Sequence, residues 1–127
     1  MKAYNVAIVG ATGLVGQEFV KILQQRGFPI ASLRLFASDR SAGKKLFFGH
    51  REIEVQETTP DAFHEIDIAL FSAGPEASRY FSPIAAKNGA LVIDNSAAFR
   101  MEPNVPLVVP EVNAEDIRWH EGIIANP

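Results

Sequence analysis

Apolar residues gather along the chain in short continuous runs, separated by longer stretches in which apolar and polar residues recur with helical spacing. The first run, Asn5–Val9, ends directly in Gly10, which is typical of a strand buried on both faces. Between residues 14 and 23 the apolar side chains recur every three or four positions, and Gly27 follows. This pattern predicts a strand, a glycine turn and an amphipathic helix that stops at Gly27.

Further apolar runs continue the alternation of strands and helices. Leu33–Ala37 predicts a second strand, which completes a strand–helix–strand unit. Ile66–Phe71 and Leu91–Ile93 predict two more strands, and between them a stretch of helical length reaches Asn88 and stops at Gly89. The alternation predicts an α/β fold: a Rossmann-like, doubly wound, mostly parallel sheet with helices on both faces.

Three segments are less regular. Leu46–Phe48 and Glu52–Val55 predict a small antiparallel addition, although their register cannot be read from the sequence. Leu107–Val109 and Ile123–Ala125 are candidates for two short strands. Asn113 lies between them and is a candidate N-cap for the intervening turn.

Composition narrows the class of protein. A chain of 127 residues is long enough for one hydrophobic core, so we expect a single domain over residues 1–127. The hydrophobic fraction of 47% and the charged fraction of 21% are typical of an ordinary globular domain and exclude a disordered chain. A formal net charge of −3 argues against a protein that coats the phosphate backbone of nucleic acid.

The sequence predicts neither a membrane segment nor a resident metal. The apolar run Val6–Val9 is broken by Gly10, too soon for a signal peptide or a membrane span. The absence of cysteine excludes disulfides and thiolate metal sites. His50, His64 and His120 lack metal-ligand spacing. We therefore expect a cytoplasmic domain without a metal.

The turn after the first predicted strand contains glycines at every third position: Gly10, Gly13 and Gly16. In a dinucleotide-binding domain the first would allow the tight turn, the second would let the helix N-terminus approach a diphosphate, and the third would permit close packing of helix and strand. The free N–H groups and the helix dipole then face the anion. Glycines also occur in purely structural turns, but a buried strand before and an amphipathic helix after favour nucleotide binding.

The end of the second predicted strand bears on the choice of dinucleotide. NAD-preferring sites place an acidic residue there to accept a hydrogen bond from the ribose, whereas this chain has Ser38. Arg40, Ser41 and Lys44 follow and supply two cations and a hydroxyl for a 2′-phosphate, while Asp39 has close basic neighbours. The loop favours NADP over NAD, and a solvated polar loop without a ligand is the alternative.

Arg100 is a candidate phosphate ligand. It follows the polar triplet 94–96, which ends the fourth predicted strand, and α/β sheets bind ligands beyond the carboxyl ends of their strands. Its planar guanidinium suits phosphate. The alternative is an exposed arginine that pairs with Glu102.

Several of these segments together resemble the bacterial aspartate-semialdehyde dehydrogenase family. The resemblance is carried by Val9–Gly16, Ala37–Lys44, Ser72–Gly74, and Asp94–Met101 together with Val109–Asn113. It implies the N-terminal NADP-binding domain of a longer two-domain enzyme. In the family the pair Asn-Pro, here residues 126–127, is followed by asparagine and the nucleophilic cysteine, so we expect the chain to stop just before that cysteine.

The resemblance also implies roles for particular positions in cofactor and substrate binding. The residues implied are Gly10, Thr12, Gly13, Leu14, Val15 and Gly16 for the diphosphate loop, Arg40 and Ser41 with Ser38 for the 2′-phosphate, Ser72, Ala73 and Gly74 for the wall near the nicotinamide, and Arg100 for the phosphate of the substrate or inorganic phosphate. No catalytic residue is expected within the chain.

The family's reaction is the reductive dephosphorylation of β-aspartyl phosphate to aspartate semialdehyde, through a cysteine thioester that NADPH reduces. The resemblance implies this oxidoreductase activity in lysine, threonine and methionine biosynthesis for the full-length protein, as a homodimer or homotetramer, and no activity for the chain alone. One alternative is an N-acetyl-γ-glutamyl-phosphate reductase, which Ser72–Gly74 and Pro110–Asn113 fit less well. Another is a catalytically inactive homologue.

Overall fold

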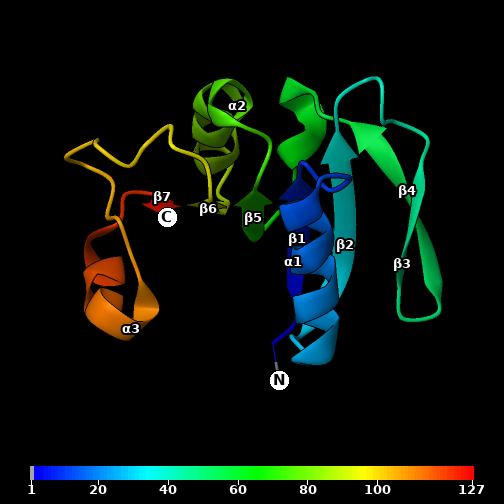
Figure 1. The fold of residues 1–127 in the computed structure, drawn as a ribbon, viewed down its shortest axis with the longest axis horizontal. Helices are drawn as coiled ribbons and strands as arrows, with labels where there is room; N and C mark the ends of the chain where they lie inside the picture. Colours follow the sequence, from blue (N-terminus) through cyan, green and yellow to red (C-terminus); the bar gives the residue numbers. More distant parts are fainter. Residues whose placement is uncertain (1) are drawn as a thin grey trace.

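The computed structural model of the protein describes residues 2–127. Figure 1 shows a central sheet with helices on either side of it. The strands are β1 (Tyr4–Val9), β2 (Ile30–Ala37), β3 (Lys45–Phe48), β4 (Arg51–Glu57), β5 (Ile68–Phe71), β6 (Leu91–Asp94) and β7 (Ile123–Ala125). The helices are α1 (Leu14–Gln25), α2 (Pro75–Lys87) and α3 (Pro110–Asn113), with 3₁₀ turns η1 (Pro60–Phe63) and η2 (Ala114–Trp119).

The seven described strands form one sheet in the order β3-β4-β2-β1-β5-β6-β7. Every pairing is parallel except that of β3 with β4. From the central strand β1 the chain first winds outward through β2 and then crosses back to β5 on the other side. This order is doubly wound, and it confirms the predicted Rossmann-like class.

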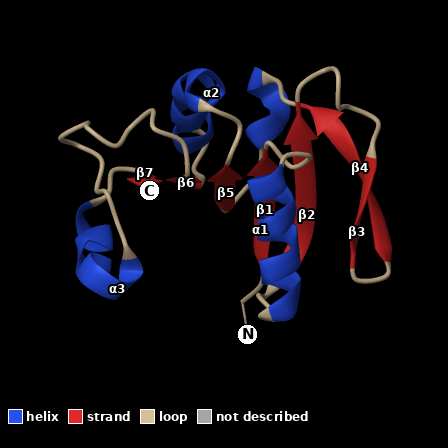
Figure 2. Cartoon of the chain, in the orientation of Figure 1, coloured by secondary structure: helices blue, strands red, loops and turns tan. Residues whose placement is uncertain are grey.

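Two hydrophobic clusters cover opposite faces of the sheet. Consecutive residues of a strand point to opposite faces, so Val6 and Ile8 of β1 belong to one cluster, while Ala7 and Val9 belong to the other. Helix α1 packs on the first face through Val20, and α2 packs on the second. Figure 2 shows the two helices over different halves of the sheet.

Phe63 anchors the connection between β4 and β5. Its side chain is fully buried, and its ring stacks on Phe71 and tilts against Phe36, each at a centroid distance of 6.0 Å. The turn η1 thereby packs on β2 and β5 next to α2, whose Phe81 ring lies 6.3 Å from that of Phe63.

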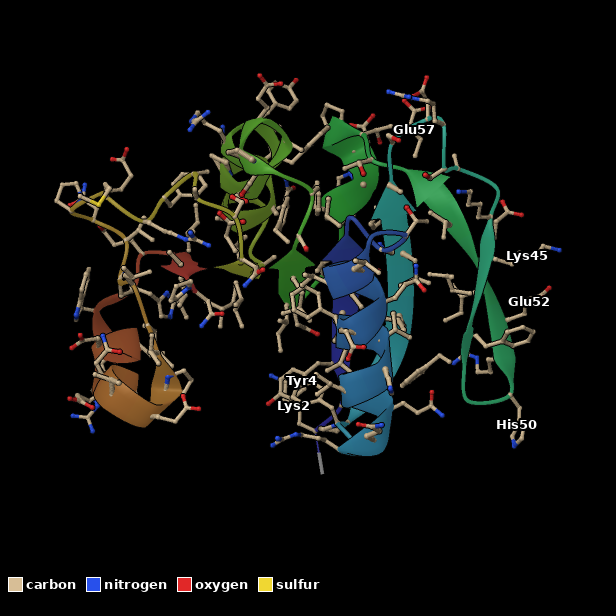
Figure 3. The ribbon with its side chains drawn as sticks, viewed as in Figure 1. Lys2, Tyr4, Lys45, His50, Glu52 and Glu57 are labelled. Atoms are coloured by element: carbon tan, nitrogen blue, oxygen red, sulfur yellow. The ribbon has the colours of Figure 1, made fainter. Side chains whose placement is uncertain are left out.

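The predicted hairpin is confirmed, and the structure supplies its register. Lys45 of β3 lies opposite Glu54 of β4, and an ion pair of 3.4 Å joins Lys45 to Glu52 (Figure 3). In addition, β4 pairs in parallel with β2, with Ala37 opposite Glu57. The hairpin is therefore the edge of the main sheet rather than a separate addition, and the carboxyl ends of β2 and β4 lie side by side.

Two predicted strands are shorter than expected. The third begins at Ile68 rather than Ile66, because Glu65 has a positive φ of 58° and turns the chain before it joins the sheet. The segment Leu107–Val109 is not a strand; Leu107 makes only an isolated bridge to Ala125. Prolines at both ends, residues 106 and 110, each lack the N–H that a longer ladder would need.

The prediction that Asn113 caps a helix is correct in position but wrong in its bonding. Asn113 directly precedes η2 and makes no cap hydrogen bond there. Its side-chain oxygen instead accepts from the N–H of Val109 at 2.8 Å, and its amide donates to the carbonyl of Leu107 and to Asp116. The side chain therefore fixes the turn before α3.

The ends predicted for the two long helices are close to those observed. After α1 the chain reverses at Gly27, and after α2 it reverses at Gly89, both with positive φ. Among residues 2–127, none of the helices is both long enough and apolar enough to cross a lipid bilayer.

The substitution Phe63→Ala should lower the free energy of unfolding by about 3–5 kcal/mol, because it leaves a cavity between β5 and η1. Urea unfolding followed by circular dichroism measures the loss. The control is Phe47→Ala on β3, where the side chain is 63% exposed and its removal should cost less than about 1 kcal/mol. Equal losses would contradict the assignment of Phe63 to the core.

Candidate functional site

The turn between β1 and α1 is held against two neighbouring strands by its backbone. The N–H groups of Gly10 and Ala11 both donate to the carbonyl of Phe36 on β2, at 2.9 and 3.0 Å. Gly10 has φ +88°, and a Cβ there would lie 2.5 Å from the carbonyl oxygen of Ser72 after β5. Only glycine fits this position, and the turn lies where the carboxyl ends of three strands meet.

Gly16 allows α1 to sit directly on the same turn. A Cβ at Gly16 would lie 2.0 Å from the carbonyl oxygen of Gly10 and 2.8 Å from the Cα of Ala11. The sequence predicted close packing of helix and strand at this position. The contact is instead with the turn that follows the strand, and the requirement for glycine is the same.

Gly13 differs from its two neighbours because the protein leaves space around it. A Cβ there would meet nothing nearer than the carbonyl oxygen of Gly10, at an ordinary distance of 3.6 Å. Gly13 is also the N-cap of α1, and no side chain caps this end of the helix. The N–H groups of Leu14, Val15 and Gly16 in the first turn have no acceptor within the helix. These amides and the helix dipole form a site for an anion.

An open cavity of about 460 Å³ lies beside this uncapped helix end, at the carboxyl edge of the sheet. The sequence-predicted residues that line it are Gly10, Thr12, Gly13, Ser38, Ser72 and Ala73. These residues come from three segments far apart in the chain. The fold therefore brings the diphosphate loop, the end of β2 and the end of β5 to one place.

The remaining predicted cofactor residues lie around the cavity but do not line it. Leu14 and Val15 are exposed on the first turn of α1, 88% and 41% respectively, and Gly16 is buried beneath them. Gly74 is the N-cap of α2, directly after the lining residue Ala73.

Arg40 and Ser41 lie in a turn just beyond the cavity. In this segment of the chain, Asp39 is the last residue that lines it. The N–H of Ser41 donates to the carbonyl of Ser38 at 3.0 Å, which closes the turn with the exposed Arg40 at its outer end. The N–H of Val55 on β4 donates to the carbonyl of Lys44 at 2.7 Å and fixes the far end of the loop.

The cavity also contains residues that the sequence did not single out. Glu57 and Thr58 enter it from the end of β4, and Ala77 and Phe81 enter it from α2. The parallel pairing of β4 with β2 is what places the end of β4 here, and this pairing could not be read from the hairpin pattern. Ala77 and Phe81 could not be singled out either, because the face of α2 that lines the cavity is determined by how the helix packs on the sheet.

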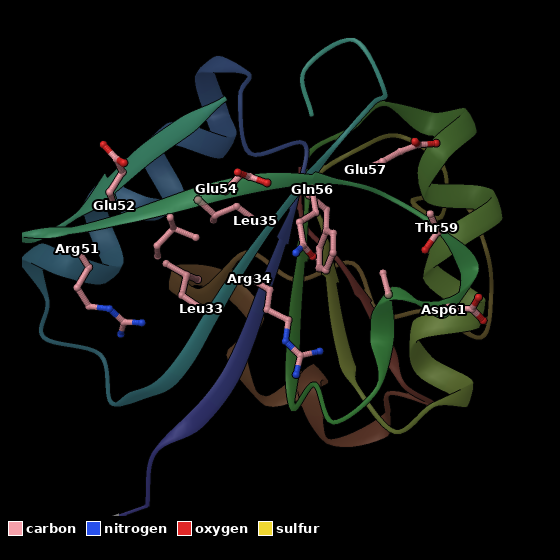
Figure 4. A pocket seen from close by; sticks show the side chains of 13 residues that line it. Leu33, Arg34, Leu35, Arg51, Glu52, Glu54, Gln56, Glu57, Thr59 and Asp61 are labelled. Carbon is pink, nitrogen blue, oxygen red and sulfur yellow. The ribbon is translucent and has the colours of Figure 1, made fainter. Parts of the chain in front are cut away.

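A larger cavity of about 600 Å³ lies along β2, β4 and η1 (Figure 4). Its rim is polar, and the guanidinium of Arg34 within it donates to the carbonyl of His64 at 2.8 Å. Its lining residues include no glycine, and the helix end beside it is that of η1, a four-residue 3₁₀ turn that begins with proline. The smaller cavity therefore has the stronger features of a ligand site.

Arg100 lies outside both cavities, in the loop after β6. Buried Asp94 shapes this loop by accepting hydrogen bonds from the N–H and the hydroxyl of Ser96, at 3.1 and 2.8 Å. One terminal nitrogen of Arg100 donates to the carbonyl of Asn95 at 3.1 Å, while its Nε is buried and has no hydrogen-bond partner. The alternative pairing of Arg100 with Glu102 is not formed among residues 2–127.

The end of β7 is tied to the same loop. Asn126 donates its N–H to the carbonyl of Asp94 at 2.9 Å and its side-chain amide to the carbonyl of Val108 at 2.8 Å. Its side-chain oxygen accepts from the amide of Asn95 at 3.3 Å. The segments after β6 and β7 therefore form one connected structure.

The doubly wound sheet, the glycine turn and the uncapped helix beside a cavity define a nucleotide-binding α/β domain. The family model described as "Semialdehyde dehydrogenase, NAD binding domain" matches residues 5–120. The chain belongs to this family, and it is an NAD(P)-binding domain.

Individual relatives agree with this assignment. The chain is 53% identical over 126 residues to an aspartate-semialdehyde dehydrogenase of Bacillus subtilis, a match that covers 99% of this chain and 36% of that protein. The chain thus spans little more than a third of the length of the curated relatives it matches.

Two solved structures are similar to the fold. The crystal structure of aspartate semialdehyde dehydrogenase II from Vibrio cholerae, complexed with ASA, has a TM-score of 0.95 and 48% identity, covering 99% of this chain and 42% of that one. A Candida albicans aspartate semialdehyde dehydrogenase, determined with NADP, has a TM-score of 0.78 and 28% identity, covering 98% and 42%.

The two glycines of the turn should respond differently to alanine. Gly16→Ala should lower the free energy of unfolding by about 1–3 kcal/mol, because the new methyl group overlaps backbone that has little room to move. Gly13→Ala, the matched variant, should cost about 1 kcal/mol or less, since the position is open and extended. Thermal unfolding of both variants under one buffer condition compares them, and a larger loss for Gly13→Ala would contradict the packing described.

Proposed function

We propose that this chain is the NADP-binding domain of an aspartate-semialdehyde dehydrogenase, which reductively dephosphorylates β-aspartyl phosphate. The observation that carries the proposal is the uncapped first turn of α1 beside the cavity. Its amides have no acceptor among residues 2–127, and Gly13, which has no side chain, leaves space next to them. A diphosphate supplies the negative charge and the acceptor oxygens that these amides lack. The names of the relatives support aspartate semialdehyde as the substrate over the acetylated glutamyl analogue.

The preference for NADP follows from the turn after β2. Arg40 projects from an exposed turn, beside the hydroxyls of Ser38 and Ser41, so its guanidinium is free to bind a 2′-phosphate bidentately. Lys44 adds a second cation in the same loop. The Candida albicans neighbour, which was determined with NADP, supports the same choice.

The nicotinamide end of the cofactor would lie toward the end of β5. Ser72 and Ala73 line the cavity directly above Gly10, and Gly74 then starts α2 with a positive φ of 91°. These three residues present backbone and small side chains, which let a flat nicotinamide ring come close. When bound, the dinucleotide supplies the hydride.

Arg100 would bind the phosphate of the substrate or inorganic phosphate. Its Nε is a buried donor without an acceptor, an arrangement that costs free energy unless an anion completes it. The carbonyl of Asn95 holds the guanidinium in place by accepting from one terminal nitrogen. The chain contains no cysteine, so we assign it cofactor and phosphate binding, and the thiolate step belongs to residues outside it.

NADPH should bind the chain at least about tenfold more tightly than NADH, because a 2′-phosphate gains charge-assisted hydrogen bonds from the turn after β2. Titration of the reduced nicotinamide fluorescence measures both dissociation constants. Tighter binding of NADH would overturn the 2′-phosphate assignment, and no binding of either by a folded sample would overturn the proposed function.

Arg40→Ala should weaken NADPH binding by about tenfold or more and leave NADH binding within about twofold, since the lost contact is to the 2′-phosphate alone. The matched control is Arg26→Ala, an exposed arginine at the opposite end of α1. It should change neither affinity. A parallel loss of NADPH and NADH binding in Arg40→Ala would assign the residue to the diphosphate or to the fold.

A further inference from the structure

Glu57 has a position that the proposed function does not yet use. It is the last residue of β4, opposite Ala37 of β2 in the ladder, and it lines both the nucleotide cavity and the larger cavity beside it. Figure 4 shows its side chain extending from the end of β4 toward α2. Among residues 2–127, the carboxylate of Glu57 takes part in no ion pair and accepts no hydrogen bond.

Bound as proposed, the dinucleotide would place its adenine ring near this carboxylate. With the diphosphate at the first turn of α1 and the 2′-phosphate at the turn after Ser38, the adenosine ribose would lie between them. The adenine is attached to the same ribose and would enter the remaining part of the cavity, which is bounded by the end of β4 and by α2. There Ala77 and Phe81 of α2 line the cavity and present apolar surface suited to the face of a flat ring.

The polar groups at this end of the cavity offer acceptors. The hydroxyl of Thr58 donates its hydrogen to the carbonyl of Ala37 at 3.1 Å, so toward a ligand this oxygen can only accept a hydrogen bond. The carboxylate oxygens of Glu57 are hydrogen-bond acceptors. Adenine presents two donors on its exocyclic 6-amino group, whereas a 6-oxopurine presents an acceptor there.

We propose that Glu57 accepts a hydrogen bond from the 6-amino group of adenine and makes the site selective for adenine over 6-oxopurine dinucleotides. The inference rests on the proposed function, because it requires the diphosphate at the first turn of α1 and the 2′-phosphate at the turn after β2. It assigns a base-recognition role to the end of β4.

The test compares NADPH with reduced nicotinamide hypoxanthine dinucleotide phosphate, which carries a 6-oxo group in place of the 6-amino group and, with it, a hydrogen on N1. The native chain should bind NADPH about tenfold more tightly than the analogue, as expected when a charged acceptor loses its donor. Glu57→Gln should reduce this ratio to about threefold or less, because the glutamine amide donates to the 6-oxo oxygen as readily as its carbonyl accepts from the amine.

The matched control is Glu54→Gln on the same strand, which lines only the larger cavity and should keep the native ratio. The ratio of two affinities within one variant cancels any general loss of stability. An unchanged ratio in Glu57→Gln, or equal binding of both dinucleotides by the native chain, would overturn the role of Glu57 while leaving NADP binding intact. Failure of the native chain to bind NADPH would overturn both proposals.

Discussion

The contact of three stretches of backbone at the carboxyl edge of the sheet is the constraint on which the rest of the structure depends. Gly10 meets the carbonyl of Ser72 on one side and Gly16 of α1 on the other, at distances that leave no room for a single methyl group. Because no side chain intervenes, the first turn of α1 is brought as near to the strand ends as the chain allows. The cavity and the free amides beside it are consequences of this packing.

The same packing separates structural from ligand-facing glycines. Gly10 and Gly16 are required by the protein itself, whereas the space at Gly13 is filled by no part of the protein. A regular spacing of three glycines in the sequence thus contains two different physical reasons for the absence of a side chain. The space left at Gly13 is the reason to look for an anion there rather than for a tighter fold.

Much of this architecture could be predicted from the sequence because it depends on local patterns. The apolar run before Gly10, the helical spacing after it and the glycines that end α1 and α2 determine the first half of the sheet. The parallel pairing of β4 with β2 was not predictable, because a hairpin pattern gives only the pairing of its own two strands. The cavity residues that depend on this pairing, Glu57 and Thr58, were missed for the same reason.

The predictions that were wrong in detail concern groups whose partners lie elsewhere in the chain. Leu107–Val109 has the composition of a strand, but the prolines that flank it limit its ladder to one bridge. The side chain of Asn113 bonds backward to Val109 and Leu107, which a rule for helix starts does not foresee. The phosphate role of Arg100 stays a prediction, and the carbonyl of Asn95 that accepts from its guanidinium could not be read from the sequence.

The two outer strands also determine how the sheet meets its surroundings. An exposed sheet edge is a template on which another chain can add a strand. Here β3 is four residues long and places Lys45 at its start, while β7 has three residues and already pairs with Leu107 through Ala125. Both margins are therefore short, which limits the unpaired backbone on which a neighbouring molecule could extend the sheet.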